Sequence, residues 1–194
     1  MTEPPTRIVR AAADLLSRGG PEAVSTRAVS AGARVQVPAI YRQFGDMQEL
    51  LHAAAREVLA GYIRQKAKHA PTDDPVAEVR RGWDTHVAFG LANPAAYVLI
   101  YGTAAAGGSE HRDGYAMLEA LVGRIAEAGR LKVSVAHAAQ LIHAGACGVT
   151  LSLISTPEGE RDPKLSPLMR ETVLASITTT PAPEPKKERV SARA

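Results

Sequence analysis

Residues 25–50 read STRAVSAGARVQVPAIYRQFGDMQEL, and this stretch decides the fold. Ser25 stands where a helix N-cap belongs and opens a short helix that runs to about Gly32. After a tight connection, a second short helix covers roughly residues 37–43, and Gly45 ends it. Two short helices joined so closely predict a compact local unit whose second helix projects.

Longer helices flank this pair on both sides. Asp46, with Glu49 three residues later, resembles a capping box with Asp in place of Ser or Thr, and it opens a helix to about His69. Upstream, a helix over about residues 6–18 stops at the glycines 19–20. The first three helices can bury a small core and leave the second short helix projecting, as a helix-turn-helix requires. The expected core residues are Ile8, Leu15, Leu16, Val24, Val29, Val35, Ile40 and Phe44.

Proline and glycine residues mark the helix boundaries in the rest of the chain and divide it into five further helices. Asp74-Pro75 and Asn93-Pro94 are N-cap and N1 pairs, since proline at N1 gives up an amide that has no partner there. The expected helices cover residues 75–91, 94–106, 110–128 and 134–155, and a last one capped by Ser166-Pro167 runs to about residue 178. Nine helices and no convincing strand predict an all-α fold. The composition of residues 181–194 predicts a disordered tail, which we expect to be solvated and idle in DNA binding.

Composition bounds the possible functions of the 194 residues. The length allows one compact body or a small domain plus a larger one, and the net charge of +3 permits nucleic-acid binding without demanding it. The single cysteine, Cys147, excludes an internal disulfide framework and a cysteine-based zinc site. The six histidines form no metal-ligand motif, and no catalytic signature or phosphate loop is present, so we expect no enzyme, metal or cofactor.

Two segments of the chain bear on the location of the protein. Residues 1–10 contain no apolar core of signal-peptide length, so a cytoplasmic protein is expected. Residues 133–157 lack charged side chains but contain His, Gln, Thr, Ser and Gly, which favours a buried helix over a membrane span. No membrane partner is expected.

Three segments carry a resemblance to a known family. TRIVRAAADLLSRG at residues 6–19, STRAVSAGA at residues 25–33 and VQVPAIYRQFGDMQEL at residues 35–50 are similar to the N-terminal signature of the TetR/AcrR family of transcriptional regulators. The resemblance covers about the first fifty residues. It implies a homodimeric repressor that binds a palindromic operator in double-stranded DNA and is released by a small, mostly apolar effector. A TetR-like DNA-binding or protein-interaction module without effector response is the alternative.

The resemblance also implies the domain boundaries and the residues that contact DNA. Residues 1–46 would form the helix-turn-helix domain and residues 47–180 the effector-binding and dimerisation domain, followed by the tail. Arg42 can pair bidentately with guanine, and Gln43 can serve adenine or a phosphate. Thr26, Arg27 and Tyr41 would contact the sugar-phosphate backbone, which sets register and not sequence preference. Gln36, Val37 and Ala39 would be further exposed side chains of the recognition helix, and each residue has a plainer alternative as packing or solvated surface. The implied DNA-binding residues are Thr26, Arg27, Gln36, Val37, Ala39, Tyr41, Arg42 and Gln43.

Three positions depart from the family pattern. Arg34 occupies the turn position where the family usually has Gly, and a left-handed conformation there costs roughly 1 kcal/mol. Pro38 lies in the first turn of the recognition helix, where proline is tolerated. Met47-Gln48 replaces a lysine often found before Glu-Leu, which removes one expected phosphate contact.

The C-terminal helices should enclose the effector cavity. Aromatic and other apolar side chains are its expected lining, and the alternative is that they are ordinary core. The candidates are Trp83, His86, Phe89, Tyr97, Tyr101, Met117, Leu121 and Leu141.

The stretch 134–155 is apolar nearly all round, and such a helix needs a second partner besides its own core. In the TetR family the last two long helices of each subunit form a four-helix bundle across a two-fold axis, so the resemblance implies a dimer there. The candidate contacts are Ala138, Ile142, Gly145, Ala146, Val149, Leu153, Met169, Val173 and Ile177.

Overall fold

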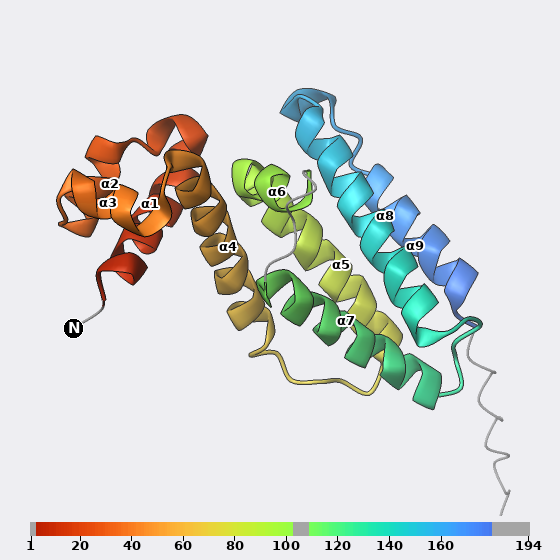
Figure 1. Ribbon diagram of the computed structural model, residues 1–194. Coiled ribbons are helices and arrows are strands. Elements are labelled where there is room, and N and C mark those ends of the chain that lie inside the picture. Colours follow the sequence, from red (N-terminus) through yellow and green to blue (C-terminus); the bar gives the residue numbers. More distant parts are fainter. Residues whose placement is uncertain (1–2, 103–108, 180–194) are drawn as a thin grey trace, which may run out of the picture.

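The computed structural model describes residues 3–102 and 109–179, and within these ranges the chain is all-α (Figure 1). The predicted tail and residues 103–106 of the predicted sixth helix lie outside the described residues. The helices are α1 Pro4–Ala23, α2 Thr26–Ala33, α3 Val37–Phe44, α4 Met47–Lys66, α5 Pro75–Ala92, α6 Pro94–Tyr101, α7 Ser109–Glu127, α8 Val135–Ser155 and α9 Leu165–Ile177.

Side-chain caps fix four of the predicted helix starts. Ser25, Asp46 and Ser134 each accept a hydrogen bond from the amide three residues later, at 3.2, 2.8 and 3.2 Å. Asp74 accepts from the amides two and three residues later, at 3.0 and 3.2 Å. These bonds satisfy amides that the first helical turn leaves without intrahelical partners.

Other helix ends differ from expectation. α9 begins at Leu165, so Ser166 lies inside its first turn and is not the N-cap; its hydroxyl accepts instead from Trp83 Nε1 at 3.0 Å. α4 ends at Lys66 instead of His69. A short 3-10 helix, Glu158–Glu160, was not predicted. The first helix was predicted to end at glycines 19–20. In the structure α1 is interrupted at Gly20, whose φ of 69° is not a right-handed helical value.

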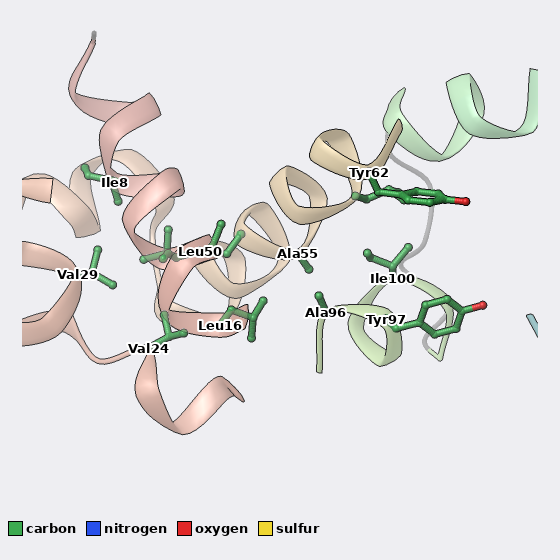
Figure 2. Packing of buried hydrophobic residues seen from close by; sticks show 14 of the residues in the cluster. Ile8, Leu16, Val24, Val29, Leu50, Ala55, Tyr62, Ala96, Tyr97 and Ile100 are labelled. Atoms are coloured by element: carbon green, nitrogen blue, oxygen red, sulfur yellow. The ribbon is translucent and has the colours of Figure 1, made fainter. Parts of the chain in front are cut away.

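Two buried clusters organise the described chain. The first joins α1, α2, α3, α4 and α6 with Phe89 of α5. Figure 2 shows Leu16 and Leu50 between α1 and α4, and Ala55 on the side of α4 that faces Ala96 of α6. All eight predicted core positions of the helix-turn-helix are buried or partly buried in it. The second cluster joins α5, α7, α8 and α9 around Trp83, Val122 and Ile142.

Figure 1 shows α4 between the small N-terminal helices and the larger C-terminal body. α8 and α9 pack side by side on the part of that body away from α4, and an isolated antiparallel bridge between Leu131 and Thr178 ties the end of α9 to the loop before α8. α8 is long and apolar enough to cross a membrane by length and composition, but one face of it packs against α5, α7 and α9.

Candidate functional sites

α3 is held to the small N-terminal body by one fully buried side chain, Ile40. Its opposite face is exposed, including two large apolar side chains, Val37 at 37% and Tyr41 at 46% exposure. Among the residues implied to touch DNA, Thr26 and Ala39 are half-buried and the other six are exposed. The structure therefore brings all eight to the surface of α2 and α3, and their contacts with DNA stay a prediction.

The turn between α2 and α3 adopts the strained conformation that the sequence suggested. Arg34 has φ 54° and ψ 51°, and it is the only non-glycine residue with positive φ in the described chain. Ser30 stabilises this turn: its hydroxyl donates to the Val35 carbonyl at 2.6 Å, and its own carbonyl accepts from the Val35 amide at 3.1 Å. Ser30 is a residue that the sequence reasoning missed, because its partner is set only by the turn.

The electrostatics of this surface favour a polyanion. The first 45 residues contain six arginines against Glu3, Asp14 and Glu22. The ion pairs of the described chain all lie in α4 and beyond, so none involves these arginines. Arg27 on α2 and Arg42 on α3 are exposed arginines of this surface, and guanidinium groups without an ion-pair partner are suited to phosphates and guanine edges.

A cavity opens between α4, α5, α7 and α8. It is a partly open hollow of about 630 Å³, a volume that includes the open solvent at its mouth. The lining residues are Tyr62, Ile63, Lys66, Val79, Gly82, Trp83, His86, Tyr101, His111, Gly114, Tyr115, Leu118, Leu121, Ile142, His143 and Ala146.

The structure brings half of the predicted lining together around this cavity. Trp83, His86, Tyr101 and Leu121 line it. The other four candidates lie outside the cavity wall, which corrects the prediction for them: Phe89, Tyr97, Met117 and Leu141.

Each of these four lies elsewhere because of its place on its helix. Phe89 stacks on the Tyr62 ring with centroids 4.5 Å apart, and Tyr97 is fully buried behind the wall. Met117 is half-buried on α7 outside the cavity, and Leu141 is 37% exposed on the outer side of α8.

The sequence reasoning missed the polar part of the lining. Tyr62 and Lys66 stand four residues apart on α4, and His111 and Tyr115 stand four apart on α7, with His143 facing them from α8. An i, i+4 pair of an aromatic and a polar residue places both on one helix face, and that was the available signal.

Aromatic rings and histidines form one network at this site. Ring centroids lie 5.6 Å apart for His86 and Tyr101, 5.3 Å for His111 and His143, and 5.5 Å for Tyr115 and His143. The interplanar angles of these three pairs are 68–88°. Such edge-to-face packing builds a preformed wall.

Burial disfavours the charged forms of three groups at this site. Burial, with electrostatic contributions from Lys66, His143 and His111 adding to it, lowers the pKa of His86 to about 3. Burial also lowers the pKa of His143, with His111 contributing, and raises the pKa of the Tyr62 phenol to about 12. His86 Nε2 lies 2.6 Å from the Tyr97 hydroxyl, which orients the ring.

Cys147 lies behind the histidines, with Sγ 3.8 Å from His86 Nε2 and 3.7 Å from His143 Nε2. Burial raises the pKa of its thiol to about 11, so it is not the thiolate that nucleophilic chemistry or metal binding needs. The described ranges contain no group of three or more His, Cys, Asp or Glu that could hold a metal ion.

The predicted dimer contacts divide into two sets. Six of them are buried in this chain's own core and cannot touch a second copy, so the prediction is wrong there: Ala138, Ile142, Ala146, Val149, Leu153 and Ile177. Gly145 also faces inward, because a Cβ on it would lie 2.9 Å from the Trp83 ring. Met169 is 38% exposed and Val173 half-buried, so for these two the prediction stays open.

The outer face of α8 and α9 is the one left uncovered. Leu141 and small residues repeat along α8, beside Leu168 at 67% exposure and Met169 on α9. We call this the outer α8/α9 face; its members are Leu141, Ala144, Gly148, Ser152, Leu168, Met169 and Thr172. It carries three of the six large exposed apolar side chains in the described chain.

Comparisons with known proteins agree with this geometry. Residues 8–54 match the sequence model of the bacterial regulatory proteins of the tetR family. No curated protein matches the sequence significantly.

Solved structures share the fold over most of the chain. RolR without ligand superposes with a TM-score of 0.69 at 17% identity, covering 90% of this chain and 91% of that one. RolR in complex with its ligand resorcinol gives a TM-score of 0.68 at 16% identity, covering 90% and 87%. The TetR family transcriptional regulator PfmR from Thermus thermophilus gives 0.59 at 22% identity, covering 87% and 97%. The fatty acid degradation regulator FadR from Bacillus halodurans gives 0.61 at 16% identity, covering 90% and 96%.

Proposed function

We propose that this chain, whose residues 8–54 match the sequence model of the tetR family of bacterial regulatory proteins, is a homodimeric repressor of that family whose operator affinity is set by a small effector in the α4–α5–α7–α8 cavity. Members of this family are regulators and not enzymes. Because the proposed target is chromosomal DNA, a cytoplasmic location is part of the proposal.

One observation carries the proposal: α4 belongs to both parts of the molecule. Its first half buries Leu50 and Ala54 in the N-terminal cluster, against α1. Its last turns place Tyr62, Ile63 and Lys66 in the cavity wall. A ligand that binds better to one position of α4 therefore shifts the orientation of α2 and α3. If the ligand lowers the affinity for operator DNA by some factor, operator DNA must lower the affinity for the ligand by the same factor.

The outer α8/α9 face supports the dimer. Two copies that meet there by a two-fold axis form an isologous interface, and small residues on α8 allow close approach of helices. Such a dimer would place two copies of α3 about 34–36 Å apart, one turn of DNA, for two half-sites of a palindrome.

The relatives support an aromatic molecule as the first class of effector to try. RolR, whose fold this chain shares, has been solved with resorcinol as ligand. The cavity here is walled by Trp83, Tyr101 and Tyr115, which suit a flat ring.

DNA binding tests the first half of the proposal. The affinity of the purified protein for DNA from upstream of its own gene is measured by fluorescence anisotropy against a shuffled duplex, over a range of salt concentrations. We expect sequence-dependent binding that weakens steeply with salt, because phosphate contacts release counterions.

Matched variants locate the contact. Arg42→Ala should reduce the preference for the operator about 10- to 100-fold, as the loss of one bidentate base contact does. Tyr41→Phe should weaken binding to both duplexes equally, since a backbone contact carries no sequence preference. Arg81→Ala, an exposed arginine on α5, is the control and should change neither affinity by more than about twofold. Specific binding that survives Arg42→Ala unchanged would contradict the assigned role of α3.

A further inference from the structure

We propose that the cavity selects an aromatic organic anion, such as an arene carboxylate, whose acidic group pairs with Lys66 and the Tyr62 hydroxyl while its ring lies against the aromatic wall. This inference rests on the proposed function for the existence of an effector, and it adds the charge and shape of that effector.

Lys66 supplies the charge. Its ammonium group lies between α4 and α5: Nζ is 6.0 Å from the Tyr62 ring centroid, and a Cβ on Gly82 would lie 3.9 Å from it. The ion pairs of the described chain do not include Lys66. Burial lowers the pKa of Lys66, and a partly desolvated cation without a counter-charge is stabilised by an anion brought to it.

Tyr62 supplies an unused hydrogen-bond donor. Its ring is only 9% exposed and is fixed by stacking on Phe89, with centroids 4.5 Å apart and planes at 19°. Its hydroxyl is buried and has no hydrogen-bond partner. Figure 2 shows that this hydroxyl points away from Leu50 and Ala55, out of the N-terminal cluster. A buried donor without a partner destabilises the free protein, and an acceptor on the ligand would satisfy it.

The rest of the lining disfavours a cationic ligand. None of the described lining residues is Asp or Glu, so a cationic ligand would find Lys66 and no carboxylate. His86, His111 and His143 add N–H donors but no negative charge. The polar half of the cavity therefore offers donors on α4, α5, α7 and α8 to a group that accepts.

The other half of the lining sets the shape. Tyr101 and Tyr115 stand edge-to-face with the histidines, while Trp83, Leu118 and Leu121 close the apolar side. Rings arranged in this way leave faces and edges for one more flat ring. A planar arene with one acidic substituent matches both halves.

The fluorescence of Trp83, the only tryptophan in the chain, reports binding directly because Trp83 lines the cavity. The full-length protein is titrated with benzoate, its neutral isostere benzamide, and the cation benzylamine. We expect benzoate to bind at least about tenfold more tightly than benzamide, and benzylamine to bind most weakly.

Two variants test the assigned groups. Lys66→Met should bring the benzoate-to-benzamide ratio to about one, and Tyr62→Phe should weaken benzoate about threefold to tenfold. Lys68→Met removes an exposed lysine two residues further on and should leave the ratio unchanged. Circular dichroism checks that all variants keep the helical content of the parent.

Equal binding of benzoate and benzamide, absence of benzoate binding at millimolar concentration, or an unchanged ratio in Lys66→Met would overturn the inference. The proposed function is judged separately, from operator affinity with each probe present. If benzamide binds and releases DNA while benzoate does neither, the repressor stands and the anion inference fails. If benzoate binds through Lys66 without changing operator affinity, the inference stands and the effector response fails.

Discussion

Arg34 holds a left-handed backbone conformation, φ 54° and ψ 51°, at the corner of the helix-turn-helix. A residue with a Cβ loses roughly 1 kcal/mol there relative to glycine. We expect Arg34→Gly to raise the free energy of unfolding by about 1 kcal/mol in urea denaturation. Arg34→Ala, which removes the guanidinium but keeps the Cβ, should leave it nearly unchanged. An Arg34→Gly protein less stable than Arg34→Ala would contradict the strain at this turn.

His86 makes stability depend on pH. Its pKa in the folded protein is lowered to about 3, chiefly by burial, against 6.5 for an exposed histidine. Below pH 6.5 the unfolded chain takes up a proton that the folded chain does not, so stability falls as pH falls, by about 1.4 kcal/mol per pH unit. At about pH 5 this loss is about 2 kcal/mol.

The measurement is urea unfolding at about pH 7 and about pH 5 for the parent and for His86→Gln. The substitution lowers stability at neutral pH through the lost contact with Tyr97, but the difference between the two pH values should shrink by about 2 kcal/mol. An equal pH difference in both proteins would show that His86 titrates normally in the folded state.

At the scale of helices, close packing depends on Gly90 in α5. A Cβ there would overlap Thr150 Cγ2 on α8 and lie 2.8 Å from Tyr97 Cδ2 on α6. We expect Gly90→Ala to destabilise the protein by about 1–3 kcal/mol, because the overlap forces apart buried helices. Gly123→Ala in α7, where nothing lies within 4 Å, should stabilise it by about 0.5–1 kcal/mol. Thermal unfolding that ranks the two variants in the opposite order would contradict this packing.

Helix positions follow from the sequence far better than helix faces do. Ser25, Asp46 and Asp74 mark helix starts because capping is local chemistry. α8 is apolar nearly all round, so periodicity does not say which side turns inward: Ile142 lines the cavity while its neighbour Leu141 is exposed. The predicted dimer contacts on α8 failed for this reason.

The sequence predicted half of the candidate lining residues of the cavity correctly. Trp83 and Tyr101 followed from the expectation that aromatic residues wall a pocket. Lys66 did not, because its place in the wall comes from the approach of its side chain to Gly82 on α5, and no local pattern contains that contact. Ser166 likewise became the partner of Trp83, 83 residues away, instead of a helix cap.

For the whole molecule, the outer α8/α9 face should determine the oligomeric state. Leu168 is 67% exposed, so Leu168→Glu should fold normally yet place a charge in the proposed interface. We expect a monomer by light scattering after size exclusion, and operator affinity reduced with it. Val98→Glu, at a residue 42% exposed on α6, is the control and should remain a dimer. A dimeric Leu168→Glu protein would place the interface elsewhere.

The proposed repressor requires two copies of α3 to contact DNA at a fixed spacing. Selection of duplexes from a random pool by the full-length protein, followed by sequencing, tests this without assuming where the operator lies. We expect an enriched inverted repeat with half-site centres about 10–10.5 base pairs apart or a multiple of that, and loss of the motif with Arg42→Ala. A pool that gains no motif, or a single unpaired site that Arg42→Ala still selects, would contradict it.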